Sequence, residues 1–207
     1  MKKYLICAAA LAMMAGPVCA AAKKTAAKPR PTTLENLQKA FDGESNARAR
    51  YEAFAAKADA EGYLGVGSLF RAAAFSESLH AAKHAKAIEA LGGKPLTVAK
   101  VPVVKTTGEN LKTAIKGEND EAWKMYPAFI RKAESDNNRQ AAMSFKGAMA
   151  AENSHAHLFS KAAADLNGWK SGRKILVCQT CGYTTDDLAL KICPVCAQPR
   201  EQFKEIE

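Results

Sequence analysis

Acidic and imidazole residues recur at nearly equal spacing in the two halves of this chain of 207 residues. Each half holds a single Glu that is followed, 33 or 34 residues later, by a Glu-x-x-His motif: Glu44 with Glu77 and His80, then Glu118 with Glu152 and His155. Residues three positions apart share one face of a helix, so each motif can offer an oxygen and a nitrogen to the same cation. Carboxylates can also bridge two cations that lie about 3.5–4 Å apart. The pattern therefore predicts a two-metal site between four helices.

The apolar residues around these motifs repeat at steps of three and four, which is the spacing of one face of an α-helix. Four such faces are present, and the acidic and imidazole groups fall on their apolar sides, where an unpaired charge is costly. A single Glu there could be a boundary residue, but five Glu and two His in a near-repeat favour cations that neutralise them. The third face runs through Leu111, Ala114, Glu118, Glu121, Met125 and Phe129.

The two halves differ at one position. Glu121 follows Glu118 by three residues, whereas Ala47 stands at the matching position after Glu44. One side of the predicted site therefore has an additional carboxylate, unless Glu121 is an exposed helix residue. Mixed carboxylate and imidazole ligands without thiolates favour iron or manganese, with zinc as an alternative.

Four cysteines near the C-terminus form two Cys-x-x-Cys pairs, Cys178 with Cys181 and Cys193 with Cys196. Two such pairs predict one tetrahedral metal site with four thiolate ligands, because each pair directs two sulfurs at one ion. Two disulfides or a structural zinc site are the alternatives.

These cysteine pairs look like those of rubredoxin, because Gly-Tyr follows the first pair and the second reads Cys-Pro-x-Cys; Ala197 stands where rubredoxins usually have Gly. The Glu-x-x-His motifs are those described for ferritin-like di-iron and di-manganese bundles. In this combination, residues 34–207 resemble rubrerythrin. The resemblance implies a mainly α fold: a ferritin-like four-helix bundle with a long crossover, followed by a small rubredoxin-like four-cysteine metal domain of short β-strands.

The resemblance also implies an activity and its cofactors. The expected protein is a non-haem di-iron peroxidase that reduces hydrogen peroxide to water in oxidative stress defence. It would contain two carboxylate-bridged irons and one Fe(Cys)4 iron that relays electrons. Glu77 and Glu152 would bridge the irons, and His80 would exchange with Glu121 on oxidation. The full set of implied iron ligands in the bundle is Glu44, Glu77, His80, Glu118, Glu121, Glu152 and His155.

Three further residues have two interpretations each. Tyr51 and Tyr126 match tyrosines beside the family's site, but an amphipathic ring can also serve core packing. His84 follows His80 by one helical turn, so it either orients a ligand or is a core His with a backbone partner. His157 lies off the inward face and is expected in solvent.

Two other functions remain open at this stage. One is a ferritin-like oxidase that uses dioxygen and handles iron. The other is a non-catalytic electron carrier or a zinc-stabilised binding module. The sequence has no GxGxxG fingerprint for a dinucleotide, so electrons are expected from an unidentified donor protein. The resemblance further implies a head-to-tail homodimer in which the four-cysteine domain serves the partner's bundle.

The N-terminus predicts export. Lys2 and Lys3 precede an apolar run over residues 4–16 and small residues that end at Ala20. This is the pattern of a signal peptide over residues 1–20, which indicates an exported protein, in bacteria a periplasmic one. The run is too short for a membrane span; a lipid anchor at Cys19 is the alternative. Residues 21–33 form a basic, low-complexity tether that is expected to be disordered.

Composition and helix-breaking residues indicate the remaining domain organisation of the chain. The net charge of +9 comes without the aromatic or motif support that nucleic-acid binding needs, so docking of an acidic electron carrier or a solvated face explains it better. The bundle is expected over residues 34–168 with a crossover up to Thr107, and the rubredoxin-like domain over residues 173–207. Pro127 should kink the third helix.

Overall fold

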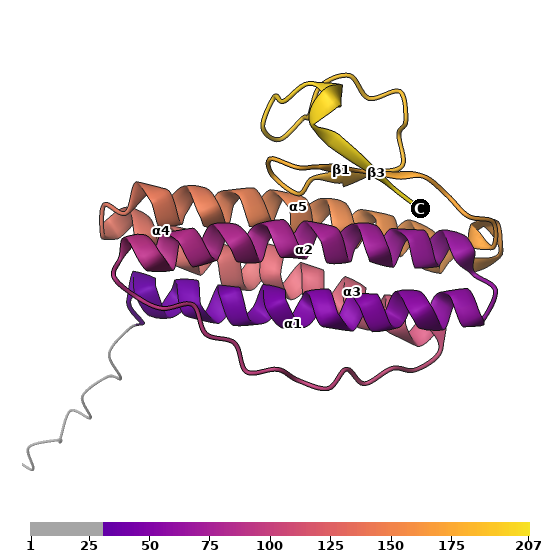
Figure 1. Ribbon diagram of the computed structural model, residues 1–207, viewed down its shortest axis with the longest axis horizontal. Coiled ribbons are helices and arrows are strands. Elements are labelled where there is room, and N and C mark those ends of the chain that lie inside the picture. Colours follow the sequence, from indigo (N-terminus) through magenta and orange to yellow (C-terminus); the bar gives the residue numbers. More distant parts are fainter. Residues whose placement is uncertain (1–30) are drawn as a thin grey trace, which may run out of the picture. The chain divides into compact units, whose positions relative to one another are not determined.

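Four long helical segments form the framework of residues 31–207, the part of the chain that this computed structural model describes. The expected signal peptide and nearly all of the basic tether lie outside the described residues. α1 and α2 form one helical pair, and α3 to α5 form the other (Figure 1). The helical elements are α1 (Thr33–Ala60), α2 (Leu64–Ala90), α3 (Thr107–Asp120), a π-helical turn η1 (Glu121–Met125), α4 (Tyr126–Ser135) and α5 (Arg139–Ala164). The expected mainly α four-helix bundle with a long crossover is confirmed.

Side-chain caps define where two of these helices begin. Thr32 accepts a hydrogen bond from the backbone N–H of Glu35, and the Glu35 carboxylate accepts one from the backbone of Thr32. Thr106 and Glu109 make the same reciprocal capping box at the start of α3. Each box satisfies two N–H groups that have no partner inside the helix.

The π-helical turn changes the register of the third helical face. A π turn absorbs one extra residue, so a residue eight positions after Glu118 takes the place that the seventh would have in a straight α-helix. Tyr126 is fully buried as a result, while Met125 is only half-buried. Met125 packs only at the edge of an apolar cluster, and Tyr126 holds the fully buried position on this face. Pro127 follows the π turn at the start of α4, and it removes one backbone donor from this continuous helical segment.

The crossover over residues 91–106 runs beside α1 and is fixed by polar contacts. Asp42 Oδ1 accepts hydrogen bonds from Thr97 Oγ1 and from the backbone N–H of Val98, both at 2.8 Å. Asn46 Oδ1 accepts one from the N–H of Lys100 at 2.9 Å. These contacts satisfy backbone groups of a segment that has no regular secondary structure.

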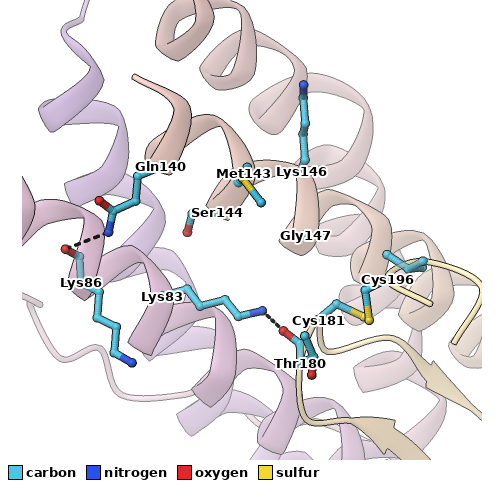
Figure 2. A pocket seen from close by; sticks show the side chains of 11 residues that line it. Lys83, Lys86, Gln140, Met143, Ser144, Lys146, Gly147, Thr180, Cys181 and Cys196 are labelled. Carbon is cyan, nitrogen blue, oxygen red and sulfur yellow. Dashed lines mark hydrogen bonds between the residues drawn. The ribbon is translucent and has the colours of Figure 1, made fainter. Parts of the chain in front are cut away.

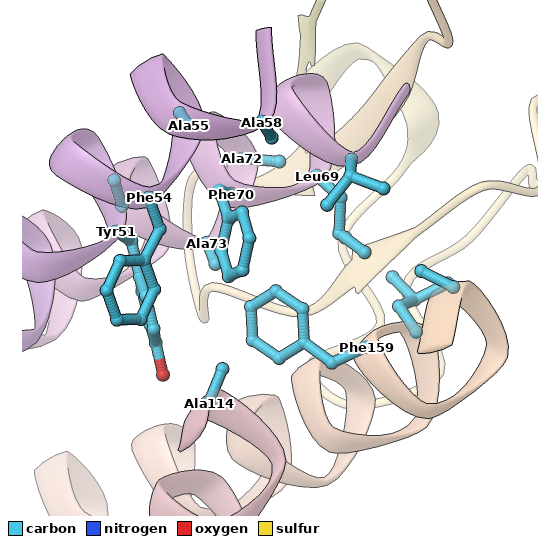
Figure 3. Packing of buried hydrophobic residues seen from close by; sticks show 14 of the residues in the cluster. Tyr51, Phe54, Ala55, Ala58, Leu69, Phe70, Ala72, Ala73, Ala114 and Phe159 are labelled. Atoms are coloured by element: carbon cyan, nitrogen blue, oxygen red, sulfur yellow. The ribbon is translucent and has the colours of Figure 1, made fainter. Parts of the chain in front are cut away.

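Two apolar clusters lie on either side of a polar layer in the bundle. Figure 3 shows part of one, in which the rings of Tyr51, Phe54, Phe70 and Phe159 pack with centroids 5.0–6.3 Å apart. The other is built around fully buried Leu37, Ile88 and Phe145, among others. The acidic and imidazole residues occupy the layer between these clusters. Helices α1, α2 and α5 contribute residues to both clusters, whereas α3 contributes to one and α4 to the other.

A small three-stranded antiparallel sheet follows the bundle. A 3-10 turn, η2 (Leu166–Trp169), leads into strands with the order β2-β1-β3. They are β1 (Ile175–Cys178), β2 (Thr184–Thr185) and β3 (Phe203–Ile206), and the 3-10 turn η3 (Arg200–Gln202) precedes the last one. Buried Trp169, with the Arg173 guanidinium over its ring at 4.4 Å, fixes the connection. None of the helices in residues 31–207 has the length and apolar character that crossing a bilayer requires.

Candidate metal centres

Six buried side chains from four helices meet in the polar layer, each at most 1% exposed. Glutamates and histidines are seldom this buried unless they are paired or bind a metal. The layer consists of Glu44 from α1, Glu77 and His80 from α2, Glu118 from α3, and Glu152 and His155 from α5.

These side chains form two overlapping groups of four, and within each group the possible ligand atoms all lie within 4.8 Å of one another. Glu77 and Glu152 belong to both groups, which is the placement that a bridging carboxylate requires. The two groups are Glu44, Glu77, His80 and Glu152, and Glu77, Glu118, Glu152 and His155.

Both imidazoles turn Nδ1 towards the carboxylates. His80 Nδ1 lies 3.0 Å from Glu77 Oε2 and 3.3 Å from Glu152 Oε1. His155 Nδ1 lies 3.1 Å from Glu152 Oε2 and 3.5 Å from Glu77 Oε1. Nδ1 is therefore the nitrogen of each ring that faces a cation bound among these carboxylates.

Several polar atoms of the layer have no hydrogen-bond partner. Each such buried group costs about 1–3 kcal/mol, and more when it is charged. Cations placed among the carboxylates would satisfy these atoms, so the residues present fit a two-metal centre. The unpartnered atoms are Oε2 of Glu44, Oε1 of Glu77, Oε2 of Glu118, both carboxylate oxygens of Glu152 and Nδ1 of His155.

Two buried tyrosines each hold one oxygen of an outer carboxylate. The hydroxyl of Tyr51 donates to Glu118 Oε1, and that of Tyr126 donates to Glu44 Oε1. Burial and the neighbouring carboxylates raise the pKa of both tyrosines well above its usual value, so the hydroxyls keep their protons. Each tyrosine thereby leaves Oε2 of its carboxylate directed into the layer. Both rings also pack in the core, so the two interpretations of these residues hold together.

Burial and neighbouring charges shift the pKa values of several groups in the layer. Burial, and after it the charges of Glu152 and Glu44, raise the pKa of Glu77 to about 8. Burial alone would lower the pKa of His80, but the surrounding carboxylates, Glu152 first, raise it well above its usual value. The same balance raises the pKa of His155. Without cations the layer therefore retains protons, which metal binding would displace.

Glu121 lies beside the layer but outside both groups of four. It is the first residue of η1, and its side chain is half-buried. Burial, followed by the charges of Glu44 and Glu118, raises its pKa well above the usual value. Glu121 also lines a cleft of about 480 Å³ together with Lys39 and Arg50. Its role as an iron ligand stays a prediction.

His84 contacts the site through hydroxyl groups. Its Nδ1 lies 2.7 Å from Ser144 Oγ, and its Nε2 lies 3.2 Å from the hydroxyl of Tyr126. The Nε2 atom is 3.8 Å from Glu44 Oε1, and His84 belongs to neither group of four. His84 thus supports the tyrosine that holds Glu44, which is the orienting role rather than direct ligation. His157 is exposed, as expected.

The four cysteines form a third cluster. Cys178 Sγ lies 3.6 Å from Cys196 Sγ, and Cys181 Sγ lies 3.5 Å from Cys193 Sγ. Four sulfurs about 2.3 Å from one central ion would lie about 3.8 Å apart, so the arrangement fits a tetrahedral metal site. No disulfide joins them. A hydrogen bond from Cys181, with further ones to the same sulfur, lowers the pKa of Cys178 to about 5.

The cysteine module, residues 175–207, sits directly on the imidazoles of its own chain. His80 Nε2 lies 3.1 Å from the carbonyl oxygen of Cys181, and His155 Nε2 lies 3.1 Å from Thr184 Oγ1. The Thr184 hydroxyl donates to the carbonyl of Gly182 at 2.9 Å, so its oxygen is an acceptor towards His155. Both rings therefore carry a proton on Nε2 and leave Nδ1 free for a cation, as outer partners of metal-binding His usually arrange.

Gly182 makes this approach possible. Its φ of +86° lies in the region that favours glycine. A Cβ atom at this position would stand 2.2 Å from His80 Nε2 and 2.4 Å from Ser76 Oγ. Ser76 Oγ instead donates a hydrogen bond of 2.8 Å to the Gly182 carbonyl.

The fold and the buried layer place the molecule among ferritin-like di-iron bundles that have a rubredoxin-like domain. Residues 35–163 match the rubrerythrin family, and residues 177–204 match the rubrerythrin rubredoxin-like domain. The chain belongs to the rubrerythrin family.

Individual relatives cover most of the chain. Nigerythrin of Nitratidesulfovibrio vulgaris is 35% identical over 173 residues, which are 83% of this chain and 85% of the relative. Rubrerythrin of Porphyromonas gingivalis is 34% identical over 182 residues, 84% of this chain and 90% of the relative. A structure of partially reduced nigerythrin superposes with a TM-score of 0.80 at 33% identity and covers 88% of this chain and 90% of its own. A bacterioferritin of Mycobacterium tuberculosis, 19% identical with a TM-score of 0.61 over 68% of this chain and 89% of its own, shares the fold.

Family membership confirms the expected cofactors, a di-iron centre in the bundle and an Fe(Cys)4 centre in the C-terminal domain, and it makes the protein an oxidoreductase at family level. The structure brings together every bundle residue that the sequence singled out as a ligand, except Glu121. It adds Ser76, Ser144 and Thr184, which the sequence analysis missed. A Ser one turn before His80 on the same helix face was the available signal for Ser76.

Proposed function

We propose that the protein is a peroxidase that reduces hydrogen peroxide to water: one peroxide takes up two electrons and two protons and yields two water molecules. The observation that carries this proposal is the pair of overlapping ligand groups sharing Glu77 and Glu152. Two irons held by these residues would supply one electron each, which is the number that cleavage of the O–O bond takes up.

The residues of the layer hold the charge of such a centre. Glu44, Glu77, Glu118, Glu121 and Glu152 carry five negative charges when ionised, against four positive charges for two ferrous ions and six for two ferric ions. The layer is therefore close to neutral in both oxidation states, and the apolar clusters on both sides exclude water from it. Tyr51 and Tyr126 keep the two outer carboxylates in place.

The proposal assigns Glu121 and His80 to a ligand exchange. His80 belongs to one ligand group, whereas Glu121 stands at the π turn beside it. Family resemblance motivates the exchange, and the raised pKa of Glu121 supports it, because a carboxylate there gains from a cation once the charge of the centre rises. Replacing Glu121 with Gln removes the charge at equal size. Glu121→Gln should slow turnover. Glu52 is an exposed residue that pairs with Arg48, so Glu52→Gln should leave turnover as it is.

The route for electrons is proposed to lie within one chain. The carbonyl of Cys181 and the hydroxyl of Thr184 contact His80 and His155 of the same chain. A head-to-tail homodimer, in which the four-cysteine domain serves the partner, is the other arrangement that the family suggests. Peroxidase activity per chain should stay constant when the protein is diluted to monomers; a loss on dilution would favour the partner route.

The decisive experiment measures metals and turnover together. We expect three irons per chain and faster oxidation of the reduced protein by peroxide than by dioxygen; the reverse order of rates would favour an iron-handling oxidase. Cys193→Ser should abolish steady turnover with a reductant but keep one stoichiometric oxidation of the pre-reduced bundle. Equal steady turnover in that variant would refute the relay, and zinc in the cysteine site would favour a structural module.

Export to the periplasm is also part of the proposal, and it rests on residues 1–20 of the sequence. Cell fractionation should recover a shortened chain that begins near residue 21. A full-length chain in the cytoplasm would contradict it.

A further inference from the structure

The two Cys-x-x-Cys pairs face different surroundings. Cys178, Cys181 and Cys193 are at most 4% exposed, and the first pair reaches the imidazole of His80 through the Cys181 carbonyl. Cys196 is half-buried, and Val195 before it is 37% exposed. Cys196 is thus the most exposed of the four cysteines.

A groove of about 610 Å³ opens beside Cys196, between the cysteine module and helices α2 and α5. Figure 2 shows Lys83, Lys86 and Lys146 around it. Val195 and Met143, which is 61% exposed, add apolar surface. We call this surface the lysine groove.

The charge of the lysine groove is of one sign. No acidic residue is among the described residues that line it. Lys83 Nζ donates to the carbonyl of Thr180, and Lys146 Nζ pairs with Glu134 Oε1 at 2.6 Å. The Lys146–Glu134 pair is about half exposed, and such surface pairs are weak, so a partner's carboxylate can replace Glu134.

We infer that the lysine groove is the docking site of an acidic one-electron carrier protein, which reduces the four-cysteine iron centre through Cys196. This inference rests on the proposed relay and names its entry point. In each encounter the carrier loses one electron and the four-cysteine centre gains it, with no bond made or broken. Two encounters match the two electrons that one peroxide consumes.

Chemistry favours a protein carrier over a small anion. A nicotinamide donates hydride, a pair of electrons, whereas a single thiolate-bound iron accepts one electron at a time. Charged rims around a small apolar contact suit transient redox encounters, which bury little surface. Complementary charge mainly speeds association, typically by 10- to 1,000-fold at low salt.

The test follows reduction of the ferric–thiolate absorbance of the iron-loaded full chain by stopped flow, without peroxide. The donor is reduced flavodoxin, an acidic flavoprotein that gives one electron at a time. Lys86→Glu with Lys146→Glu is compared with Lys112→Glu with Lys132→Glu. The control pair makes the same charge change, and Lys132 likewise pairs with an acid, Asp136, but neither control residue lines the groove.

We expect the groove pair to slow reduction by flavodoxin about tenfold or more at low salt and the control pair less than twofold. Reduced methyl viologen, a small cation, should reduce both double variants at least as fast as the unchanged protein, because added acidic groups do not repel it. Equal slowing in the two pairs, no slowing, or slower reduction of the groove pair by methyl viologen would each overturn the inference. Direct reduction of the unchanged protein by NADPH, lost in the Lys86→Glu, Lys146→Glu variant, would also overturn it. The groove would then bind a small anion.

Failure of this inference can be told apart from failure of the peroxidase proposal. The assay contains no peroxide, and the ferric–thiolate band shows before mixing that the cysteine site holds iron. A normal result here with no peroxide turnover would leave the docking site intact and refute the peroxidase.

Discussion

Replacing Gly182 with Ala tests how the cysteine module is held on the two imidazoles. The backbone of Gly182 has a φ of +86°, and the added Cβ would stand 2.2 Å from His80 Nε2. His80 is buried and cannot move aside without breaking the ligand layer. The module must therefore lift from α2.

The magnitude follows from two contributions. An L-residue in the left-handed region costs about 1–2 kcal/mol. Lifting the module also breaks the hydrogen bonds from His80 to Cys181 and from Ser76 to Gly182, at about 1 kcal/mol each. The expected loss of stability is thus about 3–4 kcal/mol, or about 10 °C in melting temperature for a chain of this length.

Gly62→Ala is the matched control. Gly62 has a φ of +79°, but an added Cβ would meet no atom within 4 Å. It should cost only the backbone contribution of about 1–2 kcal/mol. The assay is thermal unfolding of both variants in the same metal state, together with proteolysis of the 168–174 linker. Faster cleavage is expected for Gly182→Ala alone, and equal melting temperatures and equal cleavage in the two variants would refute the close docking.

Three further outcomes are expected. In the metal-free chain the pKa of Glu77 is raised to about 8 from 4.5, so its contribution to stability is full below pH 4.5 and is lost as the pH rises towards 8. Metal uptake at pH 7 should therefore release protons to an indicator dye. No proton release would contradict the raised pKa. His84→Ala leaves the hydroxyls of Ser144 and Tyr126 without their partner and opens a cavity, so urea unfolding should show a loss of about 2–4 kcal/mol, while an unchanged iron content would confirm that His84 is no ligand. Ala197 has a φ of +58°, so Ala197→Gly should stabilise the cysteine module by about 0.5–1 kcal/mol, seen as a later thermal loss of the ferric–thiolate band; an earlier loss would mean that the φ carries no strain.

The residues of the polar layer could be predicted from the sequence because the pattern that identifies them is local. Glu77 and His80 lie three residues apart, which fixes them on one helix face whatever surrounds the helix. These charged groups lie among apolar residues, so each needs a partner that offsets the cost of its burial. This follows from the sequence alone, before the neighbouring helices are known. The cysteine pairs are equally local, since each pair is a single turn of backbone.

The π turn and the docking of the cysteine module on the bundle could not be predicted from the sequence. The π turn places Tyr126, not Met125, where its hydroxyl donates to Glu44 of another helix, and residue spacing within the third helical face does not reveal that contact. Likewise, the choice of Nδ1 in His80 depends on the carbonyl of Cys181, which is 101 residues away. Spacing along the chain contains no information about which surface a domain behind a linker covers.

The position of the cysteine module determines which side of the polar layer is covered. The module closes the α2–α5 side of the polar layer, where it contacts the outer nitrogens of both imidazoles. The cleft beside Glu121, by contrast, is lined by residues of α1, α3 and η1. The cysteine module and this cleft thus lie beside different helices of the polar layer. Under the proposed function, electrons would arrive through the module, while the cleft beside Glu121 would stay open to the oxidant.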